Sequence, residues 1–151
     1  MREISISGSK RLSGEITLQG AKNSVLPILA ASVITQDESV LYNCPRLSDV
    51  DSAVKILRYL GCSADFSGHS LVVDTKGLSC DYIPDSLMRQ MRSSIVFLGA
   101  ILTRMKRAKL TFPGGCELGA RPIDLHLSSM EQFGATVTDE DGFIVCKADE
   151  K

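Results

Sequence analysis

The sequence carries one pattern twice, as VDSAVKILRYLGCSADFSGHSLV at residues 50–72 and as IDLHLSSMEQFGATVTDEDGFIV at residues 123–145, an offset of 73 residues. Within each copy apolar residues recur at intervals of three and four, which is the spacing of one face of an amphipathic helix. A glycine, Gly61 or Gly134, then stands where a helix end favours a left-handed residue. Each copy is therefore predicted to begin with a helix that ends just before its glycine.

Alternating residues after each glycine predict a hairpin of two strands. The expected strands are Ser63–Ser67 and Ser70–Asp74 in the first copy, and Thr136–Asp139 and Phe143–Lys147 in the second. Asp141-Gly142 is a strong hairpin turn signal. Upstream of the pattern each copy also has a predicted helix and strand, namely Asn23–Thr35 and Val40–Tyr42, then Ser86–Arg104 and Lys109–Phe112.

The predicted unit is thus helix, strand, helix and hairpin, used twice after an N-terminal hairpin at Glu3–Ser7 and Glu15–Leu18. Helices with one apolar face need a sheet on that side, so each unit is expected to form a two-layer sandwich. The predicted fold class is α+β, built of α/β sandwich repeats. The first repeat takes residues 22–83 and the second takes residues 84–149.

The composition excludes several classes of protein. Hydrophobic residues make up 44% of the chain and charged residues 23%, which is typical of a globular domain. A net charge of -1 gives no bulk attraction to nucleic acid or to anionic membranes. The longest apolar run, Ile95–Leu102, is far shorter than the roughly 20 residues of a spanning helix. With no signal peptide at its start, the chain is expected to be cytoplasmic, without nucleic-acid or membrane partners.

Five cysteines in a chain without a secretion signal argue against a disulfide framework. There is no Cys-x-x-Cys, and His69 and His126 have no second ligand at a usual spacing, so no metal site is expected. Four of the cysteines are expected to be small hydrophobic residues of the core: Cys44, Cys62, Cys80 and Cys146.

The two copies differ at residues 113–122, PGGCELGARP, an insertion that places Cys116 in a glycine-rich loop. Glycines allow close approach to a ligand or lid-like movement. From spacing alone Cys116 is a nucleophile, a proton donor or an incidental thiol. Lys22 and Asn23 lie at a predicted strand-to-helix junction. They could bind an anion there, or they could form an ordinary helix start with an exposed lysine. Arg89 and Arg92 share one face of the predicted helix, where they could hold an anion or lie in solvent.

Three segments resemble the bacterial UDP-N-acetylglucosamine enolpyruvyl transferases: Gly20–Asn23 with Leu26–Leu29, Met91–Ile95, and Pro113–His126. The resemblance covers the whole chain in order, and the cysteine loop is its most specific part. It implies transfer of the enolpyruvyl group of phosphoenolpyruvate to the 3′-hydroxyl of UDP-N-acetylglucosamine, the first committed step of peptidoglycan synthesis. It implies no metal and no organic cofactor. It also implies two βαβαββ-type units of an inside-out barrel, with sheets outside and helices inside.

On matching positions the resemblance implies a role for each site residue. Lys22 and Asn23 would bind phosphoenolpyruvate, and Arg92 would contact substrate. Cys116 would be catalytic, as the proton donor to the enol carbon, the residue that forms a covalent adduct and the target of fosfomycin. The residues implied to bind the sugar nucleotide are Arg121, Pro122, Ile123, Asp124 and Leu125.

The family's chain is much longer and has a second domain that completes the active site. By that comparison residues 1–21 form a hairpin belonging to the second domain, and residues 22–151 form an incomplete first domain. We interpret the chain as an N-terminal fragment or truncated copy, inactive alone, that self-associates through helix 23–35 or 86–104 or needs a complementing C-terminal part. The alternatives are a non-catalytic binding module on the same fold and a different enzyme on it, such as the shikimate-pathway enolpyruvyl transferase or an RNA 3′-phosphate cyclase.

Overall fold

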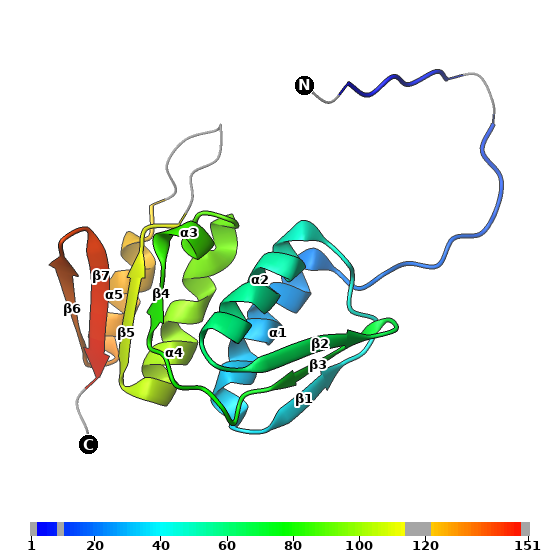
Figure 1. Cartoon of the computed structure of the whole chain (residues 1–151). Helices are drawn as coiled ribbons and strands as arrows, with labels where there is room; N and C mark the ends of the chain where they lie inside the picture. The colour runs from blue at the N-terminus through cyan, green and yellow to red at the C-terminus, as the bar shows by residue number, and fades with distance from the viewer. Residues whose placement is uncertain (1–2, 9–10, 114–121, 149–151) are drawn as a thin grey trace.

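The computed structural model describes residues 3–8, 11–113 and 122–148 as two successive units of helices and sheet (Figure 1). The first unit contains α1 (Lys22–Thr35), β1 (Glu38–Leu41), α2 (Ser48–Tyr59), β2 (Ser63–Ser67) and β3 (Ser70–Asp74). The second contains β4 (Tyr82–Ile83), α3 (Asp85–Met88), the 3-10 segment η1 (Arg92–Val96), α4 (Phe97–Met105), β5 (Arg107–Thr111), α5 (Asp124–Gln132), β6 (Ala135–Glu140) and β7 (Phe143–Ala148). The predicted α+β class and the order of helix, strand, helix and hairpin are confirmed.

Each unit has its own sheet. The first sheet has the order β1-β3-β2 and is antiparallel, with Val40 opposite Val72 and Phe66 opposite Leu71. The second has the order β4-β5-β7-β6, in which β4 runs parallel to β5 and the other pairs are antiparallel. β4 was not predicted, because a strand of two residues leaves no periodic signal in the sequence.

The turns follow the predicted chemistry. Gly61 and Gly134, which follow α2 and α5, have φ angles of 99° and 91°. Asp141 and Gly142 have φ angles of 54° and 80°, the positive pair that a tight hairpin turn requires. The Asp139 carboxylate also accepts a hydrogen bond from the Gly142 backbone N–H at 3.0 Å.

The two units meet through their helices. α1 and α4 lie side by side where the units join, and each sheet packs on helices of its own unit (Figure 1). Leu29 and Val33 of α1 and Phe97 and Ile101 of α4 are fully buried in a common core. Helices inside and sheets outside agree with the expected arrangement, while the inside-out barrel itself stays a prediction. No helix in the described part of the chain is long and apolar enough to cross a membrane.

The predicted N-terminal hairpin is wrong for this chain. Residues 3–8 and 11–20 form neither helix nor strand, and the part before Gly20 extends away from both units (Figure 1). Their alternating apolar residues, including Ile4 and Leu12, are exposed. An isolated two-stranded hairpin is at best marginally stable, and an alternating pattern forms strands only where a surface covers its apolar side. The assignment of residues 1–21 to a second domain stays a prediction.

The single helix predicted at Ser86–Arg104 is also wrong, because the chain breaks between α3 and η1. Met91 is extended, with φ -145° and ψ 144°. The break buries both Met88 and Met91, and the buried Ser94 hydroxyl donates a hydrogen bond to the Met88 carbonyl at 2.9 Å. Arg89 and Arg92 therefore do not share a helix face.

Candidate functional site

A close backbone approach sets the start of α1. The Gly20 N–H donates a hydrogen bond to the Asn43 carbonyl oxygen at 3.2 Å, and a Cβ at Gly20 would collide with that same oxygen. Ala21 is extended and α1 begins at Lys22. This places the Lys22 ammonium 2.5 Å from the carboxylate of Asp49, which lies in the first turn of α2.

The break between α3 and η1 supplies the opposite wall. Arg89 Nε donates to Asp85 Oδ2 at 2.6 Å, and this contact holds the pKa of Asp85 below its ordinary value. Arg92 has no ion pair or side-chain hydrogen bond with any residue that the structure describes. A hollow of about 380 Å³ lies between the two walls, and its polar lining comes from Lys22, Asn23, Asp49, Arg89, Gln90, Arg92 and Ser93.

A second hollow, of about 600 Å³, adjoins the first and shares Asn23 and Arg92 with it. Pro122, buried Ile123, exposed Leu125 and His126 from the start of α5 line its other side. The first hollow is therefore mainly cationic and polar, whereas the second is partly apolar.

Three helical segments point their N-terminal ends at these hollows. Lys22 and Asn23 begin α1, Arg92 and Ser93 begin η1, and Leu125 lies in the first turn of α5. Helix N-termini carry partial positive charge and unpaired N–H groups, so they favour an anion. Two adjoining hollows of this kind suit a ligand that joins anionic groups to less polar ones.

The structure brings together most of the residues that the sequence analysis singled out. Those that line one or both hollows are Lys22, Asn23, Arg92, Pro122, Ile123 and Leu125. Asp124 begins α5 without lining either hollow. Cys116 and Arg121 lie outside the described residues.

Among the residues that line the hollows, Asp49, Gln90, Ser93 and His126 were given no role from the sequence. Asp49 gave no signal beyond an acidic residue near a helix start, because its role depends on α1 and α2 beginning side by side. In the described ranges no three His, Cys, Asp or Glu side chains gather in a way that could hold a metal ion.

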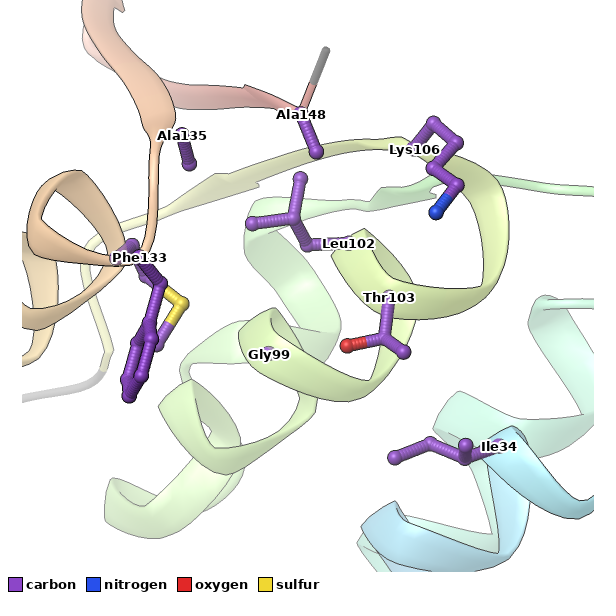
Figure 2. Close-up of a pocket in the computed structure, with 9 residues that line it drawn as sticks. Ile34, Gly99, Leu102, Thr103, Lys106, Phe133, Ala135 and Ala148 are labelled. Atoms are coloured by element: carbon purple, nitrogen blue, oxygen red, sulfur yellow. The ribbon is translucent and has the colours of Figure 1, made fainter. Parts of the chain in front are cut away.

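A third hollow, of about 410 Å³, is apolar and lies at the other end of the same helices. Figure 2 shows Ile34 of α1, Leu102 of α4 and Phe133 after α5 around it. In the first repeat, Leu60 occupies the position equivalent to Phe133 and is fully buried, whereas Phe133 is 88% exposed. In the first repeat the backbone of Ser79 also contacts this position, since its N–H donates a hydrogen bond to the Leu60 carbonyl oxygen at 3.0 Å.

The remaining thiols behave as core residues. Cys44, Cys62 and Cys146 are buried, as predicted, while Cys80 is half-buried. Burial raises the pKa of Cys62 to about 11 and raises the pKa values of Cys44 and Cys146 above their ordinary values. None of these three is a reactive thiolate near neutral pH.

Comparisons with known proteins show the family to which the chain belongs. The family model of EPSP synthase (3-phosphoshikimate 1-carboxyvinyltransferase) matches residues 6–149. The UDP-N-acetylglucosamine 1-carboxyvinyltransferase 2 of Caldanaerobacter subterraneus subsp. tengcongensis is 50% identical over 147 residues, which are 97% of this chain and 35% of that relative. The UDP-N-acetylglucosamine 1-carboxyvinyltransferase of Desulfatibacillum aliphaticivorans is 41% identical over 149 residues, 99% of this chain and 36% of that relative. The chain thus spans about a third of the length of these relatives.

Solved structures show the same fold. The enolpyruvyl transferase NikO from Streptomyces tendae matches with a TM-score of 0.81 and 25% identity, covering 95% of this chain and 32% of that one. EPSP synthase from Acinetobacter baumannii matches with a TM-score of 0.64 and 17% identity, covering 91% of this chain and 32% of that one. The latter likeness concerns the fold alone. By the family model, its relatives and its fold, this chain belongs to the EPSP synthase family of enolpyruvyl transferases.

Proposed function

We propose that this chain supplies part of the active site of a UDP-N-acetylglucosamine 1-carboxyvinyltransferase, which transfers the enolpyruvyl group of phosphoenolpyruvate to the 3′-hydroxyl of UDP-N-acetylglucosamine in peptidoglycan synthesis. The observation that carries the proposal is the pair of adjoining hollows that share Asn23 and Arg92. One is suited to a small polyanion and the other to a larger, partly apolar ligand. The names of the relatives support this choice of substrates.

The first hollow would hold phosphoenolpyruvate. Lys22 and Arg92 carry the positive charge that a phosphate and a carboxylate require, and Asn23 adds an amide that can donate hydrogen bonds. The N-terminal ends of α1 and η1 add to the same field. Charge that develops on the departing phosphate would be stabilised by these groups without rearrangement.

The second hollow would hold the sugar nucleotide. Pro122, Ile123 and Leu125 offer it an apolar surface, and Arg121 and Asp124 adjoin them in the sequence. Since Asn23 and Arg92 belong to both hollows, the acceptor hydroxyl would lie next to the enolpyruvyl group, as transfer requires.

Cys116 would protonate the enol carbon and form the covalent adduct with phosphoenolpyruvate. The thiol must carry its proton before the reaction in order to donate it, so its pKa cannot be strongly lowered. In the sequence Cys116 lies six residues before Pro122, which lines the second hollow.

The test for the reaction is phosphate release from phosphoenolpyruvate and UDP-N-acetylglucosamine. The chain alone is expected to be inactive, because the groups that take the hydroxyl proton are not expected in it. Activity should appear when the remaining part of the Caldanaerobacter relative is added as a separate polypeptide. Cys116→Ser should abolish that activity, and failure of every complementing fragment to restore it would count against the proposal.

The test for the site uses binding to the chain alone. Lys22→Gln and Arg92→Gln should each weaken binding of phosphoenolpyruvate, measured by calorimetry or by amide chemical shifts. Lys147→Gln is the matched control for Lys22→Gln, because Lys147 lies on β7, away from both hollows. Equal effects of Lys22→Gln and Lys147→Gln would refute the assignment of the first hollow.

A non-catalytic binding module on the same fold is the second candidate. It predicts binding of the sugar nucleotide without restored turnover in the complementation assay.

In either case the apolar hollow around Phe133 should be covered by another polypeptide surface. We propose that the complementing part provides it, and that without this part a second copy of the chain binds there. This surface adds the C-terminal end of α5 to the two helices expected from the sequence.

A further inference from the structure

The first hollow, which we propose binds an anion, contains an ion pair and therefore a negatively charged side chain of its own. Lys22 Nζ lies 2.5 Å from Asp49 Oδ2, and the two side chains are 50% and 22% exposed. Both residues line the hollow, although they come from the first turns of different helices. A carboxylate thus offsets the positive charge of the lysine at the place where the anion would bind.

The other charged side chains of the hollow leave few cations available to an anion, so the pairing of Lys22 matters for binding. Arg89 is engaged by Asp85, and Arg92 is the remaining cation of the lining, with no carboxylate partner among the described residues. An anion that enters therefore meets one unpaired cation and one that it must share with Asp49. A lysine ammonium has three N–H donors, so Lys22 can bind a ligand while it keeps its contact with Asp49.

We propose that Asp49 is a resident counter-ion of Lys22 that lowers the affinity of this hollow for phosphate-bearing ligands and so allows phosphate to leave. The proposal rests on the proposed function. Asp49 also orders the lysine, but a partly exposed ion pair stabilises its geometry only weakly. Repulsion between Asp49 and a ligand that shares the same ammonium acts over about 5 to 6 Å and grows with the charge of the ligand. Repulsion is therefore the larger of the two effects.

The experiment compares Asp49→Asn with Asp51→Asn in the full chain. Asp51 lies in the same turn of α2, is exposed and makes no ion pair with the described residues, so it controls for loss of charge near the helix start. The probes are acetate, inorganic phosphate and phosphoenolpyruvate, titrated at low ionic strength by calorimetry or amide chemical shifts. Circular dichroism verifies that each variant is folded.

Asp49→Asn should bind these anions more tightly, by roughly three- to tenfold per unit of ligand charge. The gain should rise from acetate to phosphate to phosphoenolpyruvate and shrink at high salt. Asp49→Glu should restore the weaker binding, and Asp51→Asn should change it less than twofold.

Weaker binding of the anions by Asp49→Asn would overturn the proposal that Asp49 lowers the affinity of the hollow. It would instead identify Asp49 as a residue that positions Lys22. A gain that is the same for all three probes, or that Asp51→Asn reproduces, would overturn it as well. These outcomes leave the proposed function standing, provided that the unaltered chain binds phosphoenolpyruvate. Absence of binding by the unaltered chain and by every variant would overturn both proposals.

Discussion

Replacing the two equivalent helix-end glycines by alanine should have unequal effects, although both have φ near 90°. At Gly134 (φ 91°) no atom lies within 4 Å of the position that a Cβ would take. At Gly61 (φ 99°) a Cβ would lie 2.5 Å from the Gly77 carbonyl oxygen and 2.7 Å from the Ser79 hydroxyl. Gly134→Ala therefore tests the backbone conformation alone, and Gly61→Ala tests the same conformation plus a backbone collision.

The magnitudes follow from those contacts. A non-glycine residue in the left-handed region costs about 1 to 2 kcal/mol, partly offset by the lower entropy of the unfolded alanine chain. We expect a loss of about 1 kcal/mol in the free energy of unfolding for Gly134→Ala. At Gly61 the segment of Gly77 and Ser79 must also move. That movement removes the hydrogen bonds from Ser79 N–H and Cys80 N–H to the Leu60 carbonyl, at 3.0 and 3.3 Å. Two such bonds add about 2 kcal/mol, so Gly61→Ala should cost about 3 kcal/mol.

Urea unfolding followed by circular dichroism measures both losses. Amide hydrogen exchange provides a second measurement, because Gly61→Ala should release protection at Ser79 and Cys80 specifically, even if the variant is too unstable for a full unfolding curve. Losses that agree within about 0.5 kcal/mol, with unchanged protection at both amides, would refute the reasoning.

The other predictions concern the apolar hollow, the thiols and one ion pair. Phe133→Ser should weaken self-association at least tenfold in light scattering, since burying a Phe side chain contributes about 2 kcal/mol, whereas Tyr42→Ser, at another exposed aromatic residue, should not. Cys116 should be alkylated before Cys62, whose pKa is raised to about 11 by burial, and peptide mass spectrometry that finds Cys62 labelled first would contradict this. The Lys76 hydrogen bond lowers the pKa of Asp37 from 3.8, so the pair stabilises the fold above that value and is lost as the pH falls through the lower folded value. In acid unfolding curves Asp37→Asn should therefore flatten this part of the pH dependence, and an unchanged slope would oppose it.

The elements that the sequence predicted correctly are those whose signal is local. The helices before Gly61 and Gly134 and the two hairpins follow from periodicity and turn residues, and both can be seen within a few residues. The N-terminal hairpin and the unbroken helix at 86–104 were wrong for a different reason. Among the described residues nothing covers the apolar side chains of residues 3–8, and the break at Met91 depends on burial of Met88 and Ser94 in the assembled fold.

The same division applies to the site. Lys22, Asn23 and Arg92 were found through motifs that resemble a known family, and all three line one or both hollows. Asp49 was missed because no spacing in the sequence says that α2 begins beside α1. Its carboxylate acts through a contact between two elements, and such contacts exist only once the helices have packed.

The direction of the helices explains why one chain has both a polar site and an apolar hollow. α1, α5 and the segment from η1 to α4 direct their N-terminal ends at the two hollows that hold Asn23 and Arg92, and their C-terminal ends at the hollow around Phe133. With about 1.5 Å of rise per residue, the 14 residues of α1 separate the two ends by about 20 Å. At that distance changes at the two ends should act independently. Arg92→Gln should weaken anion binding without altering self-association, Phe133→Ser should do the reverse, and the double variant should show the sum of both effects.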